Sequence, residues 1–266
     1  MRFFSPAKIN LFLKVLRKRP DGYHDLSSLF QMIDLGDTID IEPSPEDSLT
    51  CTDPSIPTDD SNLVLKATAL FRRKTGSKTG FKIHLKKHIP SQAGLGGGSS
   101  NAATTLWACN QLSGQPATPE MLKRWAGEIG SDVPVFFSQG TAHCTGRGER
   151  VHHLPPLPRL TLWIVKPPVG LSTPDVYRTF RLIDSHPSVS DYFLNDLETS
   201  AFKLRPELKI LKEKLLEAGF ETVLMAGSGS AFFCLGEGQP PPQPDLFMIK
   251  ARFLNRSRSH WYQKVE

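Results

Sequence analysis

A glycine-rich segment near the middle of the chain constrains the fold more than any other feature. Glycine occupies four of the five positions 94–98, serines follow at 99 and 100, and a stretch of helical character begins directly afterwards. Glycine lets the backbone approach a ligand closely and adopt positive φ, and the free N–H groups and dipole at a helix start attract phosphate. The pattern predicts a phosphate-binding loop. A flexible surface loop is the alternative, because glycine runs are common.

This loop differs from that of the P-loop proteins, because it lacks their Gly-Lys-Ser/Thr ending. Alternation at 81–85 predicts a strand before it, and 101–112 is expected to be the helix after it. We expect the whole connecting segment to bind the nucleotide. Its residues are Pro90, Ser91, Gln92, Ala93, Gly94, Leu95, Gly96, Gly97, Gly98, Ser99 and Ser100.

A strand near the N-terminus carries two candidate polar residues. Aliphatic residues at positions 9, 11, 13 and 15 alternate with other residues, which is the period-two pattern of a strand with one buried face. Lys8 and Asn10 therefore project from the opposite face. The pattern establishes only the burial of the aliphatic face, so a solvated pair of side chains remains an alternative. A turn is expected at 20–22.

The rest of the chain predicts a mixed helix and strand protein in two parts. The prolines at 155, 156 and 158 mark a linker, so we expect an N-terminal domain over 1–154 and a C-terminal domain over 155–266. Strands are expected near 26–33, 38–42, 160–165, 222–225 and 232–235, a loop over 43–61, and helices over 63–73, from Thr118 to Gly130, and over 206–218.

Two further segments are candidates for function, each with an ordinary structural alternative. Asp132 lies in the sequence Ser-Asp-Val-Pro just after a predicted helix, where Ser or Asp before Pro commonly caps a helix. Residues 226–230 read Ala-Gly-Ser-Gly-Ser between two predicted strands, which a hairpin turn alone would explain.

Composition excludes several classes of protein. The four cysteines have no CxxC spacing, which argues against a structural zinc site and against a disulfide-stapled secreted fold, so free thiols in a cytoplasmic protein are expected. No apolar run reaches the ~18 residues of a membrane span, and the N-terminus lacks the uninterrupted apolar region of a signal peptide. The net charge of +5 suits an anionic substrate, but no basic stripe interleaved with aromatics indicates nucleic-acid binding.

Taken together, three segments resemble the motifs of the GHMP kinases in their usual order. They are residues 6–11 (Pro-Ala-Lys-Ile-Asn-Leu), 94–103 (Gly-Leu-Gly-Gly-Gly-Ser-Ser-Asn-Ala-Ala) and 226–230. The resemblance covers roughly residues 5–236. It implies the α+β, two-domain GHMP kinase fold, with the active site in the interdomain cleft and ATP as co-substrate.

Additional segments indicate one branch of that family. The most discriminating is 19–24 (Arg-Pro-Asp-Gly-Tyr-His), and others are 36–37, 130–136 and 173–174. The resemblance implies a small-molecule alcohol substrate with a cytidine diphosphate moiety. Two departures stand out: Ala93 replaces a glycine of many relatives, and no closing helix is evident beyond Gly236.

The resemblance also implies roles for individual residues. Asp132 is expected to accept the proton of the substrate hydroxyl, with Lys8 beside it and Asn10 orienting the substrate. Tyr23 and Tyr177 would stack on the cytosine while His24 binds its edge, although core packing would also explain the two tyrosines. The nucleotide side would include Asn62, Lys87, Gly227, Ser228 and Gly229, and Ser100 is the candidate ligand of a Mg²⁺ ion.

Three other readings remain. A different GHMP kinase, acting on homoserine or a mevalonate derivative, would keep the phosphate loop but would not require Tyr23 and His24. A non-catalytic binding protein of the same fold should lack Lys8 or Asp132, and both are present. A nucleic-acid-binding protein would use the basic segment near the C-terminus, and its binding would depend on salt.

Overall fold

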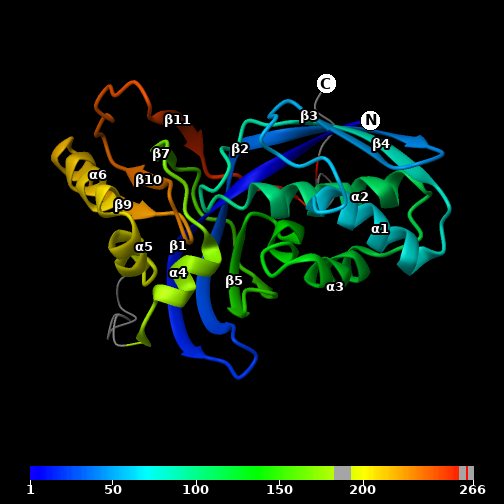
Figure 1. The fold of residues 1–266 in the computed structure, drawn as a ribbon, viewed down its shortest axis with the longest axis horizontal. Coiled ribbons are helices and arrows are strands. Elements are labelled where there is room, and N and C mark those ends of the chain that lie inside the picture. The colour runs from blue at the N-terminus through cyan, green and yellow to red at the C-terminus, as the bar shows by residue number, and fades with distance from the viewer. Residues whose placement is uncertain (183–192, 258–261, 263–266) are drawn as a thin grey trace.

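Two β-sheets, each with its own helices, lie side by side (Figure 1), and one core cluster contains residues of both. The computed structural model describes residues 1–182, 193–257 and 262. The larger sheet has the strand order β3-β4-β2-β1-β8, with β5 pairing β2 and β6 pairing β5. Its strands are β1 (Arg2–Lys18), β2 (His24–Ser44), β3 (Ser48–Cys51), β4 (Gly80–Lys86), β5 (Thr141–Gly146), β6 (Arg150–His153) and β8 (Leu194–Asn195).

The larger sheet is covered by α1 (Leu63–Thr75), α2 (Gly97–Leu112), α3 (Pro119–Ile129) and the short 3₁₀ helix η1 (Pro134–Phe137). The smaller sheet has the order β11-β7-β10-β9. Its strands are β7 (Thr161–Lys166), β9 (Thr222–Met225), β10 (Phe232–Leu235) and β11 (Phe247–Arg252), and its helices are α4 (Thr173–Thr179), α5 (Glu198–Leu204) and α6 (Pro206–Glu217). The α+β class expected from the sequence is confirmed.

The hairpin of β1 and β2 runs through both halves of the molecule. The two strands predicted at 26–33 and 38–42 are one long strand, so the expected break between them was wrong. The register shifts where Pro6 pairs with Gly36 and Ala7 with Ile33, so a β-bulge absorbs the extra residues without ending the strand. Glycine is needed at 36, because a Cβ there would lie 2.4 Å from the Phe4 ring.

Burial of β1 on both faces explains where its polar residues lie. One face packs against the helices of the larger sheet, while Ala7, Ile9 and Leu11 join a core cluster with residues of the smaller sheet. Lys8 and Asn10 are 3% and 0% exposed. The alternative of a solvated pair on an open strand face was therefore wrong.

Most of the predicted elements are confirmed, with shifts at their ends. The helix expected from 101 already begins at Gly97, so half of the glycine-rich segment forms its first turn. Thr118 caps α3 as expected, and Leu208, Leu211 and Leu215 face the core. Asn62 caps α1, which was not predicted. The sequence analysis missed β3, β5, β6, β8, β11, α4 and α5.

The C-terminal segment returns to the larger sheet instead of ending in the C-terminal domain. Phe253 bridges Ile33, and the Leu254 N–H donates to the Met32 carbonyl at 2.8 Å. Tyr262 is 2% exposed and belongs to the core cluster of the larger sheet. The expected boundary at 154/155 does separate β6 from β7, but the domain predicted for 155–266 includes residues that pack on the other half. No helix of the described segments is long and apolar enough to cross a membrane.

Candidate functional site

A cleft of about 760 Å³ lies between the two halves and brings together ten of the predicted site residues. This volume lies within the range of small-molecule sites, roughly 300–1,000 Å³. Its lining includes eight of the predicted residues from segments far apart in the sequence, together with the two loop residues described below. The eight are Lys8, Asn10, Tyr23, His24, Asp132, Tyr177, Gly227 and Ser228.

Lys8 is held in place by three neighbours. Its Nζ donates to Asn10 Oδ1 at 2.9 Å, lies 3.5 Å from the Asp132 carboxylate and sits 5.0 Å from the centre of the Phe30 ring. Asn10 in turn donates through Nδ2 to Ser28 Oγ at 2.8 Å. A buried ammonium group needs such partners, because desolvation of a lone charge is costly. The result is one cation fixed at the floor of the cleft.

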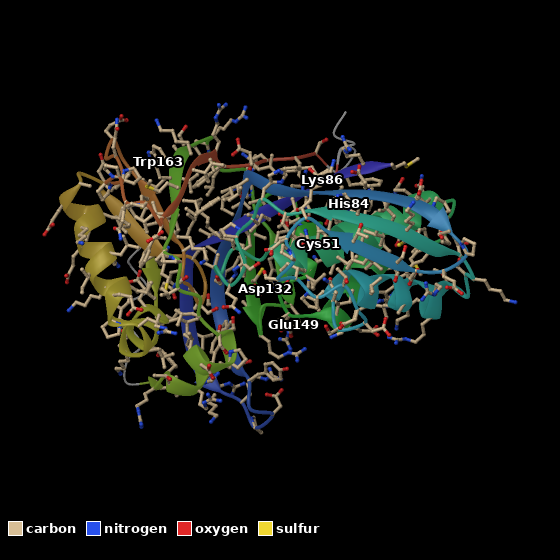
Figure 2. The ribbon with its side chains drawn as sticks, turned by 45° about the horizontal axis from the view of Figure 1, so that its top comes forward. Cys51, His84, Lys86, Asp132, Glu149 and Trp163 are labelled. Carbon is tan, nitrogen blue, oxygen red and sulfur yellow. The ribbon has the colours of Figure 1, made fainter. Side chains whose placement is uncertain are left out.

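Asp132 is open to the cleft and caps no helix. It lies in the turn between α3 and η1, where η1 begins without any side-chain capping bond. Its side chain is 37% exposed, whereas that of Lys8 is 4% exposed. Figure 2 labels Asp132 in the middle of the molecule, where the two halves meet. A carboxylate beside a fixed cation, with access to the cleft, suits a proton acceptor; the capping alternative has no support in the structure.

The glycine-rich loop leads into the start of α2. Gly94 and Ser99 line the cleft, and Gly96 has φ +71 as the residue before the helix. The first turn of α2 contains no acidic residue and no side chain caps it. Its N–H groups and the helix dipole therefore remain available to an anion, as phosphate binding requires.

The loop also contacts the third glycine motif. A Cβ on Gly94 would lie 1.8 Å from the Ala226 carbonyl oxygen, and the Ala231 N–H donates to the Ala93 carbonyl at 3.1 Å. Gly227 and Ser228 line the cleft, and Ser228 Oγ is 2.7 Å from Thr173 Oγ1. The two glycine segments therefore contact each other and together form one wall of the cleft. Gly229 lies behind that wall, where a Cβ would meet Met225 and Leu171.

The expected metal ligand is turned away from the cleft. Ser100 is fully buried, and its Oγ accepts a hydrogen bond from Ser5 Oγ at 2.8 Å. Ser99, one residue earlier, lines the cleft instead. No group of three or more His, Cys, Asp or Glu side chains that could hold a metal ion exists within the described residues.

An aromatic group lies at the other end of the cleft. The rings of His24 and Tyr177 are stacked, with centroids 5.3 Å apart and planes at 26°, and Tyr23 exposes 53% of its surface. The pKa of His24 lies below its ordinary value, mainly because the ring is partly buried and secondly because the charge of Lys18 is nearby. The pKa of the Tyr177 phenol is raised, mainly by burial and secondly by the negative charge of Asp132. Core packing does not explain Tyr23, whereas Tyr177 also packs against the core of the smaller sheet.

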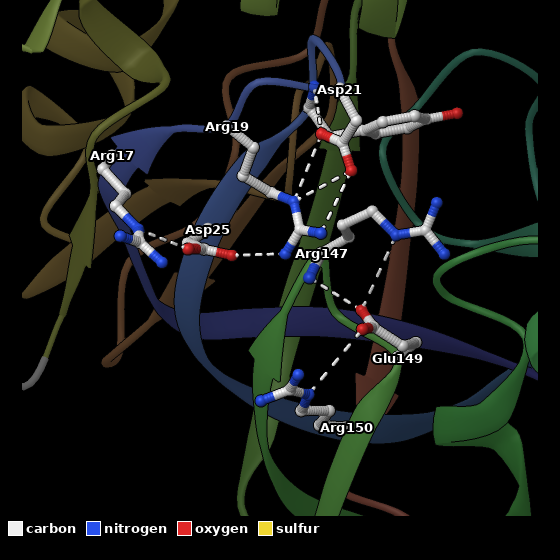
Figure 3. Close-up of polar contacts among 8 residues, drawn as sticks. Arg17, Arg19, Asp21, Asp25, Arg147, Glu149 and Arg150 are labelled. Atoms are coloured by element: carbon white, nitrogen blue, oxygen red, sulfur yellow. Dashed lines mark hydrogen bonds and ion pairs between the residues drawn. The ribbon is translucent and has the colours of Figure 1, made fainter.

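An ion-pair network orders the turn that carries Tyr23 (Figure 3). Arg19 binds both Asp21 and Asp25, and the Asp25 carboxylate also accepts from Arg17 at 2.6 Å. The hydrogen bond from the Arg19 guanidinium lowers the pKa of the Asp25 carboxyl most, and that from Arg17 adds a smaller effect in the same direction. These contacts fix a turn whose side chains would otherwise move freely in solvent.

Sequence reasoning missed three cations on the lining: Lys18, Arg147 and Arg178. The Arg147 guanidinium lies 4.9 Å from the centre of the Tyr23 ring, and its backbone N–H donates to Glu149 at 2.7 Å. It projects from the β5–β6 turn, and neither strand was predicted. The only signal was the Gly-Arg-Gly sequence at 146–148.

Four groups of predicted nucleotide-site residues lie outside the lining of this cleft. Asn62 caps α1. A Cβ on Gly98 would lie 3.7 Å from the side chain of Leu63, the residue after Asn62. Lys87 forms an ion pair with the buried Asp37. The third group is Pro90, Ser91, Gln92 and Ala93. The fourth group is Leu95, Gly96, Gly97 and Gly98.

Comparison with known proteins places these features in one family. The family descriptions "GHMP kinases N terminal domain" and "GHMP kinases C terminal" match residues 62–140 and 167–246. A 4-diphosphocytidyl-2-C-methyl-D-erythritol kinase of Protochlamydia amoebophila is 60% identical over all of this chain and 94% of its own length. The chloroplastic enzyme of the same name from Oryza sativa is 46% identical over 99% of this chain and 73% of its own length.

Solved structures agree with these sequence matches. The crystal structure of a 4-(cytidine 5'-diphospho)-2C-methyl-D-erythritol kinase superposes with a TM-score of 0.80 at 34% identity, covering 95% of this chain and 99% of the other. A homoserine kinase from Cytophaga hutchinsonii has a TM-score of 0.72 at 19% identity, covering 97% and 96% of the two chains, which shows a shared fold.

Proposed function

Because the chain belongs to the GHMP kinase family, we propose that it transfers the γ-phosphate of ATP to the 2-hydroxyl of 4-diphosphocytidyl-2-C-methyl-D-erythritol. Such an activity is a step of non-mevalonate isoprenoid biosynthesis. The observation that carries the choice of substrate is the group of Tyr23, His24 and Tyr177 on the lining of the cleft. Tyr23 and His24 belong to the 19–24 segment, whose resemblance indicates this branch of the family. The full-length 60% match to a kinase named for this substrate supports it.

Phosphoryl transfer requires mainly positioning and neutralisation of charge. In the proposed reaction the Asp132 carboxylate accepts the proton of the 2-hydroxyl while the hydroxyl oxygen of the substrate attacks the γ-phosphorus. The bond from that phosphorus to the bridging oxygen breaks, and ADP leaves. The Lys8 ammonium, 3.5 Å from Asp132, stabilises negative charge on the transferring group. Asn10 holds the Lys8 ammonium at 2.9 Å.

The nucleotide phosphates would lie on the loop between Gly94 and Ser99 and on the N-terminus of α2. Gly98 lies close to Leu63, the residue that follows Asn62 at the start of α1, which supports an adenine site there. At the other end, cytosine would stack on Tyr23 and Tyr177 with His24 at its edge. Lys18, Arg147 and Arg178 supply positive charge suited to the diphosphate.

The residues fit a magnesium ion held mainly by the ATP phosphates. Mg²⁺ usually keeps several waters and takes one or two protein ligands in addition to substrate phosphates. Ser99 and Asp132 both line the cleft and offer oxygen ligands, whereas the Ser100 hydroxyl is used by Ser5. When bound, the ion would neutralise charge on the phosphate oxygens. A cytoplasmic location stays a prediction.

The decisive experiment is an ATP-consumption assay with a panel of alcohols. The panel contains 4-diphosphocytidyl-2-C-methyl-D-erythritol, homoserine, mevalonate and galactose, each with ATP and Mg²⁺. We expect turnover with the first and none above background with the others. Turnover of homoserine or mevalonate alone would contradict the proposed substrate, and binding of ATP without turnover of any alcohol would indicate a non-catalytic protein.

A further inference from the structure

A buried carboxylate that the proposed reaction does not use lies directly behind the phosphate loop. Asp37 is 0% exposed and follows Gly36 in β2, on the strand position that pairs with Ser5 of β1. A buried carboxylate is costly unless it is paired and hydrogen-bonded. Every partner of Asp37 comes from the two segments that flank the loop.

One oxygen of Asp37 holds the segment that enters the loop. Oδ1 accepts the backbone N–H of His88 at 2.7 Å and that of Ile89 at 2.8 Å, and Pro90 follows immediately. Lys87, one residue earlier, places its ammonium on Oδ2. Three consecutive residues after β4 are therefore tied to a single side chain.

The other oxygen also holds the segment that leaves the loop. Oδ2 accepts Nδ2 of Asn101 at 2.9 Å, and that same amide nitrogen is 3.0 Å from Ser5 Oγ. Asn101 lies in the second turn of α2, whose first turn would bind phosphate. With two donors on each oxygen, the carboxylate uses its accepting capacity fully.

Packing between the two ends of the loop is close. A Cβ on Gly97 would lie 3.1 Å from Ile89 Cγ2 and 3.2 Å from Lys87 Nζ, so the helix start rests directly on the residues that Asp37 holds. Rotation of either end would therefore misdirect the helix N–H groups. A misplacement of about 1 Å at a reacting group can cost on the order of a hundredfold in rate.

We propose that Asp37 is a positioning residue for ATP, whose carboxylate fixes both ends of the phosphate loop and so sets the affinity for the nucleotide. The inference rests on the proposed function in that it takes ATP as the ligand. A preorganised loop binds more tightly because less conformational freedom is lost on binding. Substitution of Asp37 should then weaken ATP without altering the cytidine end of the cleft.

The test compares two substitutions in this network with a matched carboxylate elsewhere. Asp37→Asn replaces an acceptor by an amide whose N–H₂ faces Lys87 and Asn101. Asn101→Ala removes the link to α2, together with the contacts of the Asn101 amide with Ser5 and Lys87, and leaves the carboxylate in place. Asp47 provides the control, because it accepts the Phe81 N–H at 2.9 Å and binds Thr68 and Arg72, at the other end of β4. Asp47→Asn should lower the melting temperature and leave ATP binding unchanged.

Calorimetric titration with Mg²⁺ and a non-hydrolysable ATP analogue gives the dissociation constant, and steady-state kinetics give KM for both substrates. We expect Asp37→Asn to raise Kd and KM for the nucleotide about tenfold or more, and Asn101→Ala about three- to tenfold, with KM for the cytidine substrate within about twofold. Amide exchange of the 88–99 segment should become faster in both variants.

Both variants could lose stability, as is expected for Asp47→Asn, and still bind the nucleotide within about twofold of wild type. In that case Asp37 has only a structural role and the proposal is wrong. If Asp37→Asn does not fold, Asn101→Ala decides by the same criterion. Wild-type protein that bound no nucleotide would contradict the proposed function itself, whatever the variants did.

Discussion

The ammonium nitrogen of Lys8 lies 3.5 Å from a carboxylate oxygen of Asp132, with the lysine buried and the aspartate open to the cleft. The pair joins the centre of the N-terminal hairpin to the turn after α3. Asn10 and Phe30 hold the lysine from its other sides. A base needs access to the proton that it accepts, which the exposure of Asp132 provides, and the buried Lys8 ammonium supplies a fixed positive charge beside it.

The first prediction concerns this pair. Asp132→Asn cannot accept a proton, and general-base work contributes roughly 10²–10⁴ in rate, so kcat should fall by at least about two decades. The melting temperature should stay nearly unchanged, because Asp132 caps no helix. KM for both substrates should be roughly preserved.

Lys8→Met should lower kcat by a similar factor, and the double variant should lose less than the product of the two, because the residues act as a unit. The measurements are kcat and melting temperature for the two single variants and the double. A fully active Asp132→Asn enzyme would require another carboxylate, or positioning alone, to do this work.

The second prediction tests the glycine loop. Gly96 has φ +71, and a Cβ there would lie 2.9 Å from Lys8 Cγ, so Gly96→Val should weaken ATP binding severely and also disturb Lys8. Gly114→Ala is the control: its φ is +78, but nothing lies within 4 Å of the new Cβ. The control should lose about 1 kcal/mol of stability and keep its ATP affinity. Near-native ATP binding by Gly96→Val would mean that the loop does not bind phosphate.

The third prediction concerns base recognition. Stacking of a base on an aromatic ring is worth roughly 1–3 kcal/mol, so Tyr23→Ala should raise KM for the cytidine substrate about ten- to a hundredfold. KM for ATP should change little, because Tyr23 lies at the far end of the cleft from the loop. Tyr23→Phe keeps the ring and should stay close to wild type. Equal losses for both substrates would instead indicate a general structural defect.

Sequence reasoning found the residues that touch the cleft better than those that support them. Lys8 and Asp132 lie in motifs that the family resemblance marks, and their contact was expected. The role of Asp37 could not be expected, because the side chain is on β2 and its hydrogen-bond partners come from the segment after β4 and from α2. Neither could the burial of Lys8 and Asn10, because alternation along one strand does not reveal what covers its second face. The two-residue strand β8, from which Asn195 donates to the Gly227 carbonyl at 2.7 Å, is too short for any periodic signal.

The fourth prediction uses the pKa of His24, which burial and then Lys18 lower. The folded protein therefore disfavours the protonated ring, and the unfolded chain binds that proton more readily, with an ordinary pKa of about 6.5. The contribution of His24 to stability is present above about pH 6.5 and is lost as pH falls through the lower folded pKa.

The neutral ring is also the form that we expect to bind the cytosine edge. KM for the cytidine substrate should be constant above about pH 6.5 and rise as the pH falls through the folded pKa of His24, which lies below that value. KM for ATP, measured over the same range, is the internal control. His24→Gln should raise KM overall but flatten its pH dependence; identical profiles for wild type and variant would show that His24 is not the titrating group.

The fifth prediction concerns the C-terminal segment, for which the sequence predicted no structure. Tyr262 is buried against Phe137 and Trp107, and its hydroxyl donates to the Phe136 carbonyl at 2.5 Å. Loss of a large buried aromatic side chain costs about 3–5 kcal/mol, so Tyr262→Ala should lower the melting temperature by roughly 6–20 °C. Scanning calorimetry or circular dichroism would measure it.

Tyr262→Phe separates packing from hydrogen bonding. It keeps the ring and removes only the hydroxyl, so it should cost about 1 kcal/mol, a fraction of the loss in Tyr262→Ala. Because Phe136 belongs to η1, which begins two residues after Asp132, the alanine variant should also lower kcat at temperatures where it is still folded. A Tyr262→Ala protein as stable as wild type would mean that the C-terminal segment does not pack on the larger sheet in solution.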